Sequence, residues 1–139
     1  MNIGTIPAKA ARLNPRGEAL IDVHSGRRIT YEALDERVRR LANALNDTLG
    51  CRPGDRVAIL SRNSIEYMAI YYACARVGLI VQPLNWRLGL EELTRILADG
   101  EPRVVIVAGE YQSLADQLRP VATAEHWLSF GEGGDGSYD

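Results

Sequence analysis

The sequence has 139 residues and few side chains that could form a catalytic or metal centre. Its two histidines, His24 and His126, stand far apart, and neither has carboxylates or thiols around it at metal-ligand spacing. Cys51 and Cys74 have neither a metal nor a redox spacing. Cys74 lies among alanines and is expected in the core, whereas Cys51 follows a helix stop and is expected at the surface. We therefore predict no catalytic residue, no cofactor-binding residue and no metal ligand in this chain.

The glycine-rich segment 131–137 has the composition of a phosphate-binding loop but lacks its other features. Such a loop needs backbone N–H groups at a helix N-terminus and usually a lysine. Here two carboxylates, Glu132 and Asp135, would repel phosphate, and the chain's only lysine is Lys9. The composition favours a flexible tail or linker over a phosphate site.

Three other polar segments have structural explanations. Asn63 with Glu66 has the spacing of an Asx-type capping box. The cluster of Arg37, Arg39 and Arg40 is expected on the solvated face of a helix. The segment 85–87, Asn-Trp-Arg, follows a predicted strand, and either a subdomain or subunit contact or a cover for the edge of the core would account for it.

Composition and charge exclude several functional classes. Apolar residues make up 46% and charged residues 24% of the chain, as in ordinary globular proteins. A net charge of −2 gives no electrostatic signature for nucleic acid or an anionic membrane. Lys9, Arg12 and Arg16 interrupt the first segment, so no signal peptide is visible, and no apolar run is long enough to span a bilayer. These features predict a reduced, cytoplasmic protein with no nucleic-acid partner and no membrane span.

The elements that must hold these side chains alternate along the chain. A hairpin is expected from strands at 19–23 and 28–30, and Thr30 is placed to cap a helix that ends at Gly50. Thereafter strands at 57–60, 79–84, 104–107 and 127–130 alternate with helices at about 63–76, 90–97 and 111–118. This order predicts an α/β fold with a mainly parallel sheet flanked by helices. We expect an irregular N-terminal arm at 1–18, an α/β subdomain at 19–130 and the tail at 131–139.

Seven stretches, taken in order over about four-fifths of the chain, carry a resemblance to a known family. They are Ile29-Thr30-Tyr31 with Leu34; Gly54-Asp55-Arg56-Val57-Ala58; Asn63-Ser64 with Glu66; Ala73, Ala75 and Gly78; Pro83-Leu84-Asn85 with Arg87 and Leu88; Glu92-Leu93 with Ile96-Leu97; and Val104-Val105-Ile106. Together they resemble the opening part of the adenylate-forming superfamily, the acyl-CoA synthetases and their relatives. Gln82 stands where the family more often has a small apolar residue.

The resemblance implies the first subdomain of the large N-terminal domain of an AMP-forming acid–thiol ligase. Such enzymes use ATP and Mg²⁺ to convert a carboxylic acid to an acyl-adenylate, from which coenzyme A displaces AMP. The family's phosphate loop with its lysine, its nucleotide contacts and its magnesium-linked glutamate are expected after Asp139, and its catalytic lysine in a C-terminal domain. The resemblance therefore implies that this chain is a truncated, inactive fragment that binds none of these cofactors alone. Its expected role is architectural. Alanine substitution at Asn63 or Asp55 in the full-length enzyme is therefore expected to lower the stability of the protein before it alters the rate of turnover.

Other interpretations stay open at this point. One is a freestanding non-catalytic α/β module that binds a partner protein or a small ligand. Another is a small nucleotide-binding enzyme of Rossmann type, which is weakened because the segment 61–64 after the strand at 57–60 has no glycine. For a fragment, the expected partners are the remaining parts of the large domain and the C-terminal domain. In isolation we expect a homo-oligomer or a swapped dimer, because apolar patches and sheet edges would be exposed.

Overall fold

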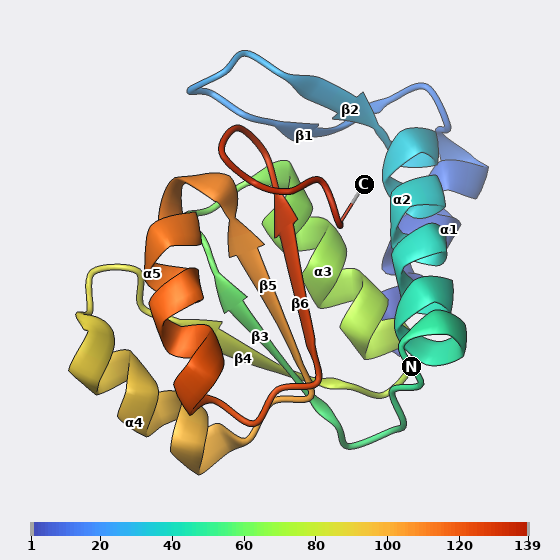
Figure 1. Cartoon of the computed structure of the whole chain (residues 1–139). Coiled ribbons are helices and arrows are strands. Elements are labelled where there is room, and N and C mark those ends of the chain that lie inside the picture. The colour runs from blue at the N-terminus through green and yellow to red at the C-terminus, as the bar shows by residue number, and fades with distance from the viewer. Residues whose placement is uncertain (1, 139) are drawn as a thin grey trace. The chain divides into compact units, whose positions relative to one another are not determined.

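The computed structural model describes residues 2–138, in which helices and strands alternate (Figure 1). The chain forms two compact units, one made of residues 2–53 and 63–79 and the other of residues 54–62 and 80–138. The first unit contains helices and a hairpin, and the second contains a four-stranded sheet. Within residues 2–138, no helix is long and apolar enough to cross a bilayer.

The sheet of the second unit is entirely parallel, as the sequence predicts. Its strands are β3 (Arg56–Leu60), β4 (Ile80–Leu84), β5 (Val104–Ala108) and β6 (His126–Phe130), in the spatial order β4-β3-β5-β6. Val57 lies opposite Val81 on one side and Val104 on the other. Residues 57–60 and 104–107 are almost completely buried on both faces of the sheet. Their uninterrupted apolar character therefore identifies central strands.

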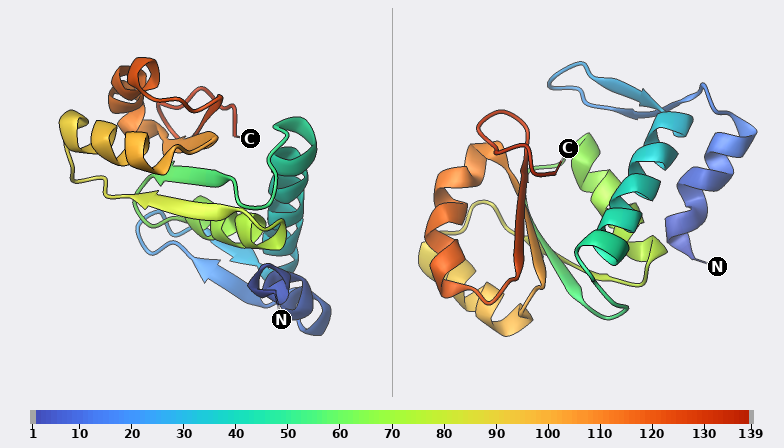
Figure 2. Two further views of the ribbon diagram at one scale, coloured as in Figure 1. Left: turned by 90° about the horizontal axis from the view of Figure 1, so that it is seen from below. Right: turned by 45° about the vertical axis from the view of Figure 1, so that its right-hand side comes forward.

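Helices α4 (Leu90–Gly100) and α5 (Gln112–Leu118) cover one face of this sheet (Figure 2). Their buried side chains pack with those that β3, β4 and β5 direct to the same face. The cluster consists of Ala58, Leu60, Leu84, Leu93, Leu97, Val105, Val107, Ala115 and Leu118. Because this core joins three strands to two helices, it fixes where each strand ends and each connecting loop begins.

Strand β4 forms one edge of the sheet and accommodates two unusual residues. Pro83 lies opposite Ile59 without ending the register, since an edge strand tolerates a residue that lacks an N–H donor. Gln82 donates from Nε2 to the carbonyl of Ile96 at 3.1 Å. A Cβ atom at Gly100 would lie 2.1 Å from that Nε2, so the large side chain at position 82 is matched by a glycine in α4. This pairing explains how the fold accepts a departure from the family's usual small residue.

The first unit begins with a helical segment where an irregular arm was expected. A 3-10 turn (η1, Ile3–Thr5) leads into α1 (Ile6–Leu13), so the prediction of an irregular arm is wrong. Pro7 occupies the first turn of α1, where a missing N–H costs nothing, and alanines follow it. The predicted boundaries at residues 18 and 130 stay predictions.

A hairpin and a long helix follow α1. Strand β1 (Glu18–Ile21) pairs antiparallel with β2 (Arg28–Thr30), as predicted. The Thr30 hydroxyl accepts a hydrogen bond from Ala33 N at 3.2 Å and caps α2 (Tyr31–Asn43). A π-helical turn (η2, Ala44–Thr48) extends α2, and Gly50 then adopts a φ of 66°, which favours glycine. The predicted helix stop at Gly50 is therefore confirmed.

Helix α3 (Ile65–Arg76) packs against α2, but its cap differs from the prediction. Ser64, rather than Asn63, accepts the hydrogen bond from Tyr67 N, at 3.1 Å. Glu66 does not close a capping box and instead contacts two arginines. Ile65, Ala69 and Cys74 are buried, whereas Met68, three residues after Ile65, is 39% exposed. The N-cap of α3 is therefore Ser64, one residue after the predicted Asn63.

Candidate functional site

The residues best placed to bind a ligand gather beyond the carboxyl ends of β3, β4 and β5. The guanidinium carbon of Arg62 lies 4.7 Å from the centre of the Trp86 ring, and that of Arg87 lies 4.4 Å from it. Arg62 also donates from Nε to the Tyr111 hydroxyl at 3.1 Å and lies 3.7 Å from a carboxylate oxygen of Glu110. The rings of Trp86 and Tyr111 are 6.3 Å apart. We call Arg62, Trp86, Arg87 and Tyr111 the arginine–tryptophan cluster.

The sheet topology brings these four residues together. Arg62 follows β3, Trp86 and Arg87 follow β4, and Tyr111 ends the 3-10 turn η3 (Gly109–Tyr111) after β5. The chain passes from β3 to β4 on one side and then from β4 to β5 on the other side of β3. A reversal of strand order of this kind creates a crevice at the carboxyl ends, where open α/β sheets bind ligands.

Local hydrogen bonds fix the turn that carries Trp86 and Arg87. The Asn85 side-chain oxygen accepts from Arg87 N at 3.0 Å, and its backbone carbonyl accepts from Leu88 N at the same distance. Gly89 N then donates to the Glu92 carboxylate at 2.9 Å at the start of α4. Trp86 and Tyr111 both pack against the core beneath. The aromatic rings are therefore anchored, while the Arg62 and Arg87 guanidinium groups remain largely exposed.

The electrostatics of the cluster favour an anion. A guanidinium over an indole face is held by a cation–π interaction and keeps its donors available. Hydrogen bonding to Tyr111 and the nearby Glu110 carboxylate raise the pKa of Arg62, so it stays charged. Within residues 2–138, Arg87 forms no ion pair with a carboxylate. The arrangement can contact a phosphate or carboxylate and a planar ring, but it contains no nucleophile or general base.

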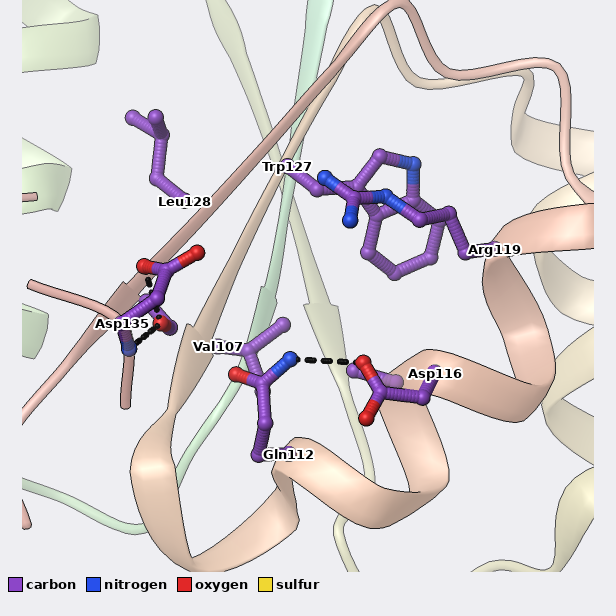
Figure 3. A pocket seen from close by; sticks show the side chains of 9 residues that line it. Val107, Gln112, Asp116, Arg119, Trp127, Leu128 and Asp135 are labelled. Carbon is purple, nitrogen blue, oxygen red and sulfur yellow. Dashed lines mark hydrogen bonds between the residues drawn. The ribbon is translucent and has the colours of Figure 1, made fainter. Parts of the chain in front are cut away.

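A small cavity between α5 and β6 is a weaker candidate (Figure 3). Its volume is about 10 Å³, enough for roughly one water molecule. Gln112 donates from Nε2 to Asp116 at 2.8 Å, and its Oε1 has no protein donor among the described residues. Asp135 accepts from the Ser129 hydroxyl at 2.6 Å and from Ser137, and these bonds lower its pKa to about 2. The cavity is therefore large enough for about one water molecule, and the glycine-rich segment folds back through hydrogen bonds between Asp135 and Ser129.

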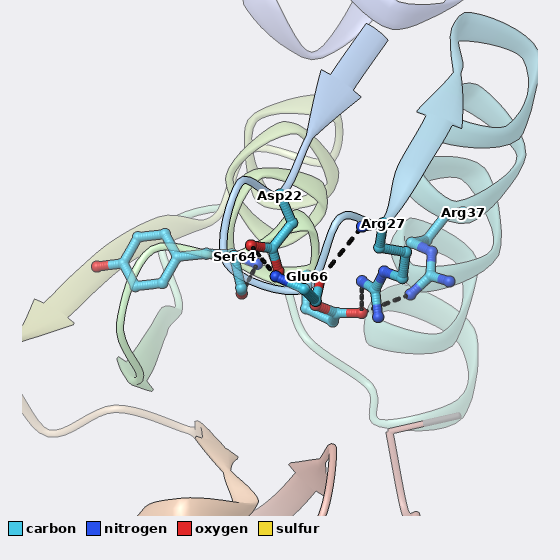
Figure 4. A network of polar contacts seen from close by, with 7 residues as sticks. Asp22, Arg27, Arg37, Ser64 and Glu66 are labelled. Carbon is cyan, nitrogen blue, oxygen red and sulfur yellow. Dashed lines mark hydrogen bonds and ion pairs between the residues drawn. The ribbon is translucent and has the colours of Figure 1, made fainter. Parts of the chain in front are cut away.

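A buried carboxylate joins three elements of the first unit (Figure 4). Glu66, in the first turn of α3, is only 8% exposed. Its Oε1 accepts from Nη2 of Arg27, in the turn after β1, and from Nη1 of Arg37 on α2 at 3.3 Å. Both contacts are charge pairs, and they connect the hairpin to α2 and α3. We interpret it as a structural network, in which Arg37 pairs with Glu66 while its own side chain remains 37% exposed.

The side chains considered from sequence are dispersed. Lys9 is exposed on α1, and His24 is exposed in the hairpin turn. His126 lies on β6, with Nε2 3.9 Å from the Glu125 carboxylate. Cys51 is 1% exposed, so its predicted surface position is wrong, and burial raises the pKa of Cys74 to about 12. Among residues 2–138 no three metal-ligating side chains come together. The absence of catalytic and ligand residues from this chain stays a prediction.

The fold and its likeness to known proteins define the class of protein. A four-stranded parallel sheet flanked by helices occurs in the N-terminal domains of adenylate-forming enzymes. The solved N-terminal domain of FACL13 from Mycobacterium tuberculosis matches this chain with a TM-score of 0.85 and 32% identity, over 93% of this chain and 34% of that one. The chain belongs to the family described as AMP-binding enzyme, whose model matches residues 7–131. The sequence resemblance to acyl-CoA synthetases is therefore confirmed.

Two sequence relatives give the same family. Feruloyl-CoA synthase from an Amycolatopsis species is 42% identical over 109 residues, which are 78% of this chain and 22% of that protein. Long-chain-fatty-acid–CoA ligase FadD13 of M. tuberculosis is 33% identical over 131 residues, 91% of this chain and 26% of that protein. The chain thus spans about a quarter of the length of these relatives and corresponds to their N-terminal portion.

Proposed function

We propose that this chain is the N-terminal portion of an AMP-forming ligase that joins a carboxylic acid to coenzyme A. The observation that supports this most is the family match over residues 7–131 in a chain that spans about a quarter of its relatives. The relatives are named for feruloyl and long-chain fatty acyl substrates, so the acid is of the aromatic or fatty type. ATP, Mg²⁺ and coenzyme A are then the cofactors of the longer enzyme, which we place in the cytoplasm.

We further propose that residues 1–139 alone are catalytically inactive and bind none of these cofactors measurably. The described residues offer an anion contact but no lysine near it, since Lys9 lies on α1 of the first unit. The test is ATP–pyrophosphate exchange with Mg²⁺ and a panel of fatty and aromatic acids. The chain extended to the length of its relatives should exchange, and residues 1–139 should not. Exchange by the short chain would refute the assignment of the chemistry to the remainder of the ligase.

For the longer enzyme we depart from the expectation that this chain holds no cofactor-binding residue, and we propose that the arginine–tryptophan cluster contacts a phosphate-bearing, ring-containing substrate. Two guanidinium groups on one indole, at the carboxyl ends of three parallel strands, support this proposal. Arg87→Ala should raise the KM of one nucleotide substrate roughly tenfold, because a hydrogen bond to a charged group is removed. Arg95→Ala is the matched control, since Arg95 is an exposed arginine paired with Glu91. Equal effects of both substitutions on every KM would refute the proposal.

We also propose that the isolated chain self-associates, because it presents exposed apolar side chains and a free sheet edge. Light scattering that shows a monomer at every concentration would contradict this. The prediction concerns residues 1–139 alone, so its outcome does not bear on the ligase assignment.

A further inference from the structure

The glycine-rich segment 131–138 lies against the 3-10 turn η3 at a distance that only glycine allows. A Cβ atom at Gly109, the first residue of η3, would lie 2.2 Å from the carbonyl oxygen of Glu132 and 2.3 Å from the backbone nitrogen of Gly134. Both are backbone atoms, so neither can turn aside as the end of a long side chain could. At Gly133 a Cβ atom would lie 3.0 Å from the carbonyl oxygen of Gly109. The segment and η3 therefore pack backbone to backbone.

Asp135 ties this segment to the end of β6 (Figure 3). The Ser129 hydroxyl donates to the Asp135 carboxylate at 2.6 Å and accepts from Asp135 N at the same distance. Ser137 N donates to this carboxylate at 2.9 Å, and Tyr138 N donates to Ser129 O at 3.2 Å. Ser129 is only 2% exposed, so the anchor on β6 is buried. These hydrogen bonds therefore hold the segment where it meets Gly109.

The other end of η3 holds Arg62 of the arginine–tryptophan cluster. Tyr111 lies two residues after Gly109, and its hydroxyl accepts from Arg62 Nε at 3.1 Å. A carboxylate oxygen of Glu110 lies 3.7 Å from the same nitrogen. The Arg62 side chain is 55% exposed, so burial does not fix its direction. Its place over the Trp86 ring therefore depends on where η3 puts these two residues.

Arg87, the second guanidinium over the indole, has a separate support. It lies 4.4 Å from the centre of the Trp86 ring, and its backbone N–H donates to the Asn85 side chain in the turn after β4. A displacement of η3 should therefore act more strongly on Arg62 than on Arg87. The two cations of the cluster are then separable by substitution.

We propose that Gly109 and the segment 131–138 are positioning residues, which hold Tyr111 and thereby direct Arg62 toward the ligand of the arginine–tryptophan cluster. The inference rests on the proposed function of that cluster and deepens it, because it assigns the direction of one cation to residues outside the cluster. Loss of the contact leaves Arg62 charged but free to turn toward solvent. An anionic substrate then meets one fixed guanidinium in place of two.

The rate at which the Arg62 Nε–H proton exchanges with solvent, measured by NMR on the 139-residue chain, tests the positioning without a ligand. Tyr111→Phe removes the acceptor and gives the rate for an unbonded Arg62. Asp135→Ala should raise the rate roughly tenfold, toward that limit, because the hydrogen bond to Tyr111 is weakened. Gly109→Ala should have the same effect, since its Cβ atom displaces η3 from the segment.

Two controls distinguish this effect from a general loss of structure. Asp99→Ala removes another exposed aspartate of the second unit, on α4, and should leave the Arg62 rate unchanged. Arg12 Nε donates to Ala8 O at 3.4 Å in the first unit, and its exchange rate should be the same in every variant. Asp135→Ala alters no atom of η3, so it decides the question even if the clash in Gly109→Ala unfolds the chain.

A double-mutant cycle in the longer enzyme tests the consequence for the substrate. Asp135→Ala should raise the KM of one nucleotide substrate roughly fivefold and add little to Tyr111→Phe, because both substitutions act through the direction of Arg62. If Arg87→Ala leaves every KM unchanged, the proposed ligand site fails, whereas the exchange rates show separately whether Arg62 is held. An Arg62 exchange rate indifferent to Asp135→Ala, or fully additive effects of Asp135→Ala and Tyr111→Phe on KM, would overturn the inference.

Discussion

Replacement of Glu66 by glutamine should destabilise the first unit by more than the loss of an exposed ion pair would. Its carboxylate accepts hydrogen bonds from Arg27 and Arg37 through a single oxygen and ties the hairpin turn and α2 to the start of α3. Glutamine keeps the size and one acceptor oxygen but removes the charge. The change therefore isolates the electrostatic contribution with little effect on packing.

The magnitude depends on the exposure of the three side chains. Counting side-chain atoms alone, Glu66 is 10% exposed, whereas Arg27 and Arg37 are 48% and 37% exposed. Breaking a fully buried pair costs about 3–5 kcal/mol, and an exposed pair contributes about 0–1 kcal/mol. The arginines can be hydrated once the carboxylate is lost, so the cost should fall between these limits. We expect Glu66→Gln to reduce the free energy of unfolding by about 1–2 kcal/mol.

Urea unfolding followed by circular dichroism measures this difference. Glu91→Gln is the control, because the Glu91–Arg95 pair is exposed on α4 and its loss should cost less than about 0.5 kcal/mol. Adding 1 M salt should weaken the exposed pair more than the Glu66 network, because buried charges are less screened. Equal, small effects of both substitutions would refute the conclusion that burial makes the Glu66 network important for stability.

Three further predictions follow from single side chains. Hydrogen bonds lower the pKa of Asp135 to about 2, so the ionised carboxylate should hold residues 131–138 in place fully above pH 4 and lose this effect as the pH falls toward 2. The rate of proteolysis of this segment as a function of pH measures the effect, with Asp135→Asn as the reference. Burial raises the pKa of Cys74 to about 12, so this thiol should resist a thiol reagent at pH 8 in the folded chain and react in urea. Ser64→Ala should cost about 1 kcal/mol in thermal unfolding through loss of the cap, while Asn63→Ala should cost less than about half of that; the reverse order would show that the cap is misassigned.

Much of the fold is predictable because its signals are local. The apolar runs at 57–60 and 104–107 identify buried parallel strands, and Thr30 and Gly50 mark the ends of a helix through a hydroxyl cap and a positive φ. The predicted cap at Asn63 fails because Asn63 and Ser64 are both good caps and adjacent. Only the geometry decides that Ser64 accepts from Tyr67 N. The exposure of Met68 depends on which face of α3 meets α2, and the burial of Cys51 on the fold around the end of α2. Neither is a property of local spacing.

The arginine–tryptophan cluster cannot be found from sequence spacing alone, but most of it can be found once the strand topology is predicted. Arg62, Trp86 and Tyr111 come from three separate loops, and no short motif contains them. Each, however, follows a parallel strand by two or three residues, and such strands bring their carboxyl ends to one edge. A search for charged and aromatic residues just after every predicted parallel strand would therefore have collected all three. The cation–π contacts of Arg62 and Arg87 on one indole could not have been obtained in that way, because they depend on the turn that Asn85 holds in place.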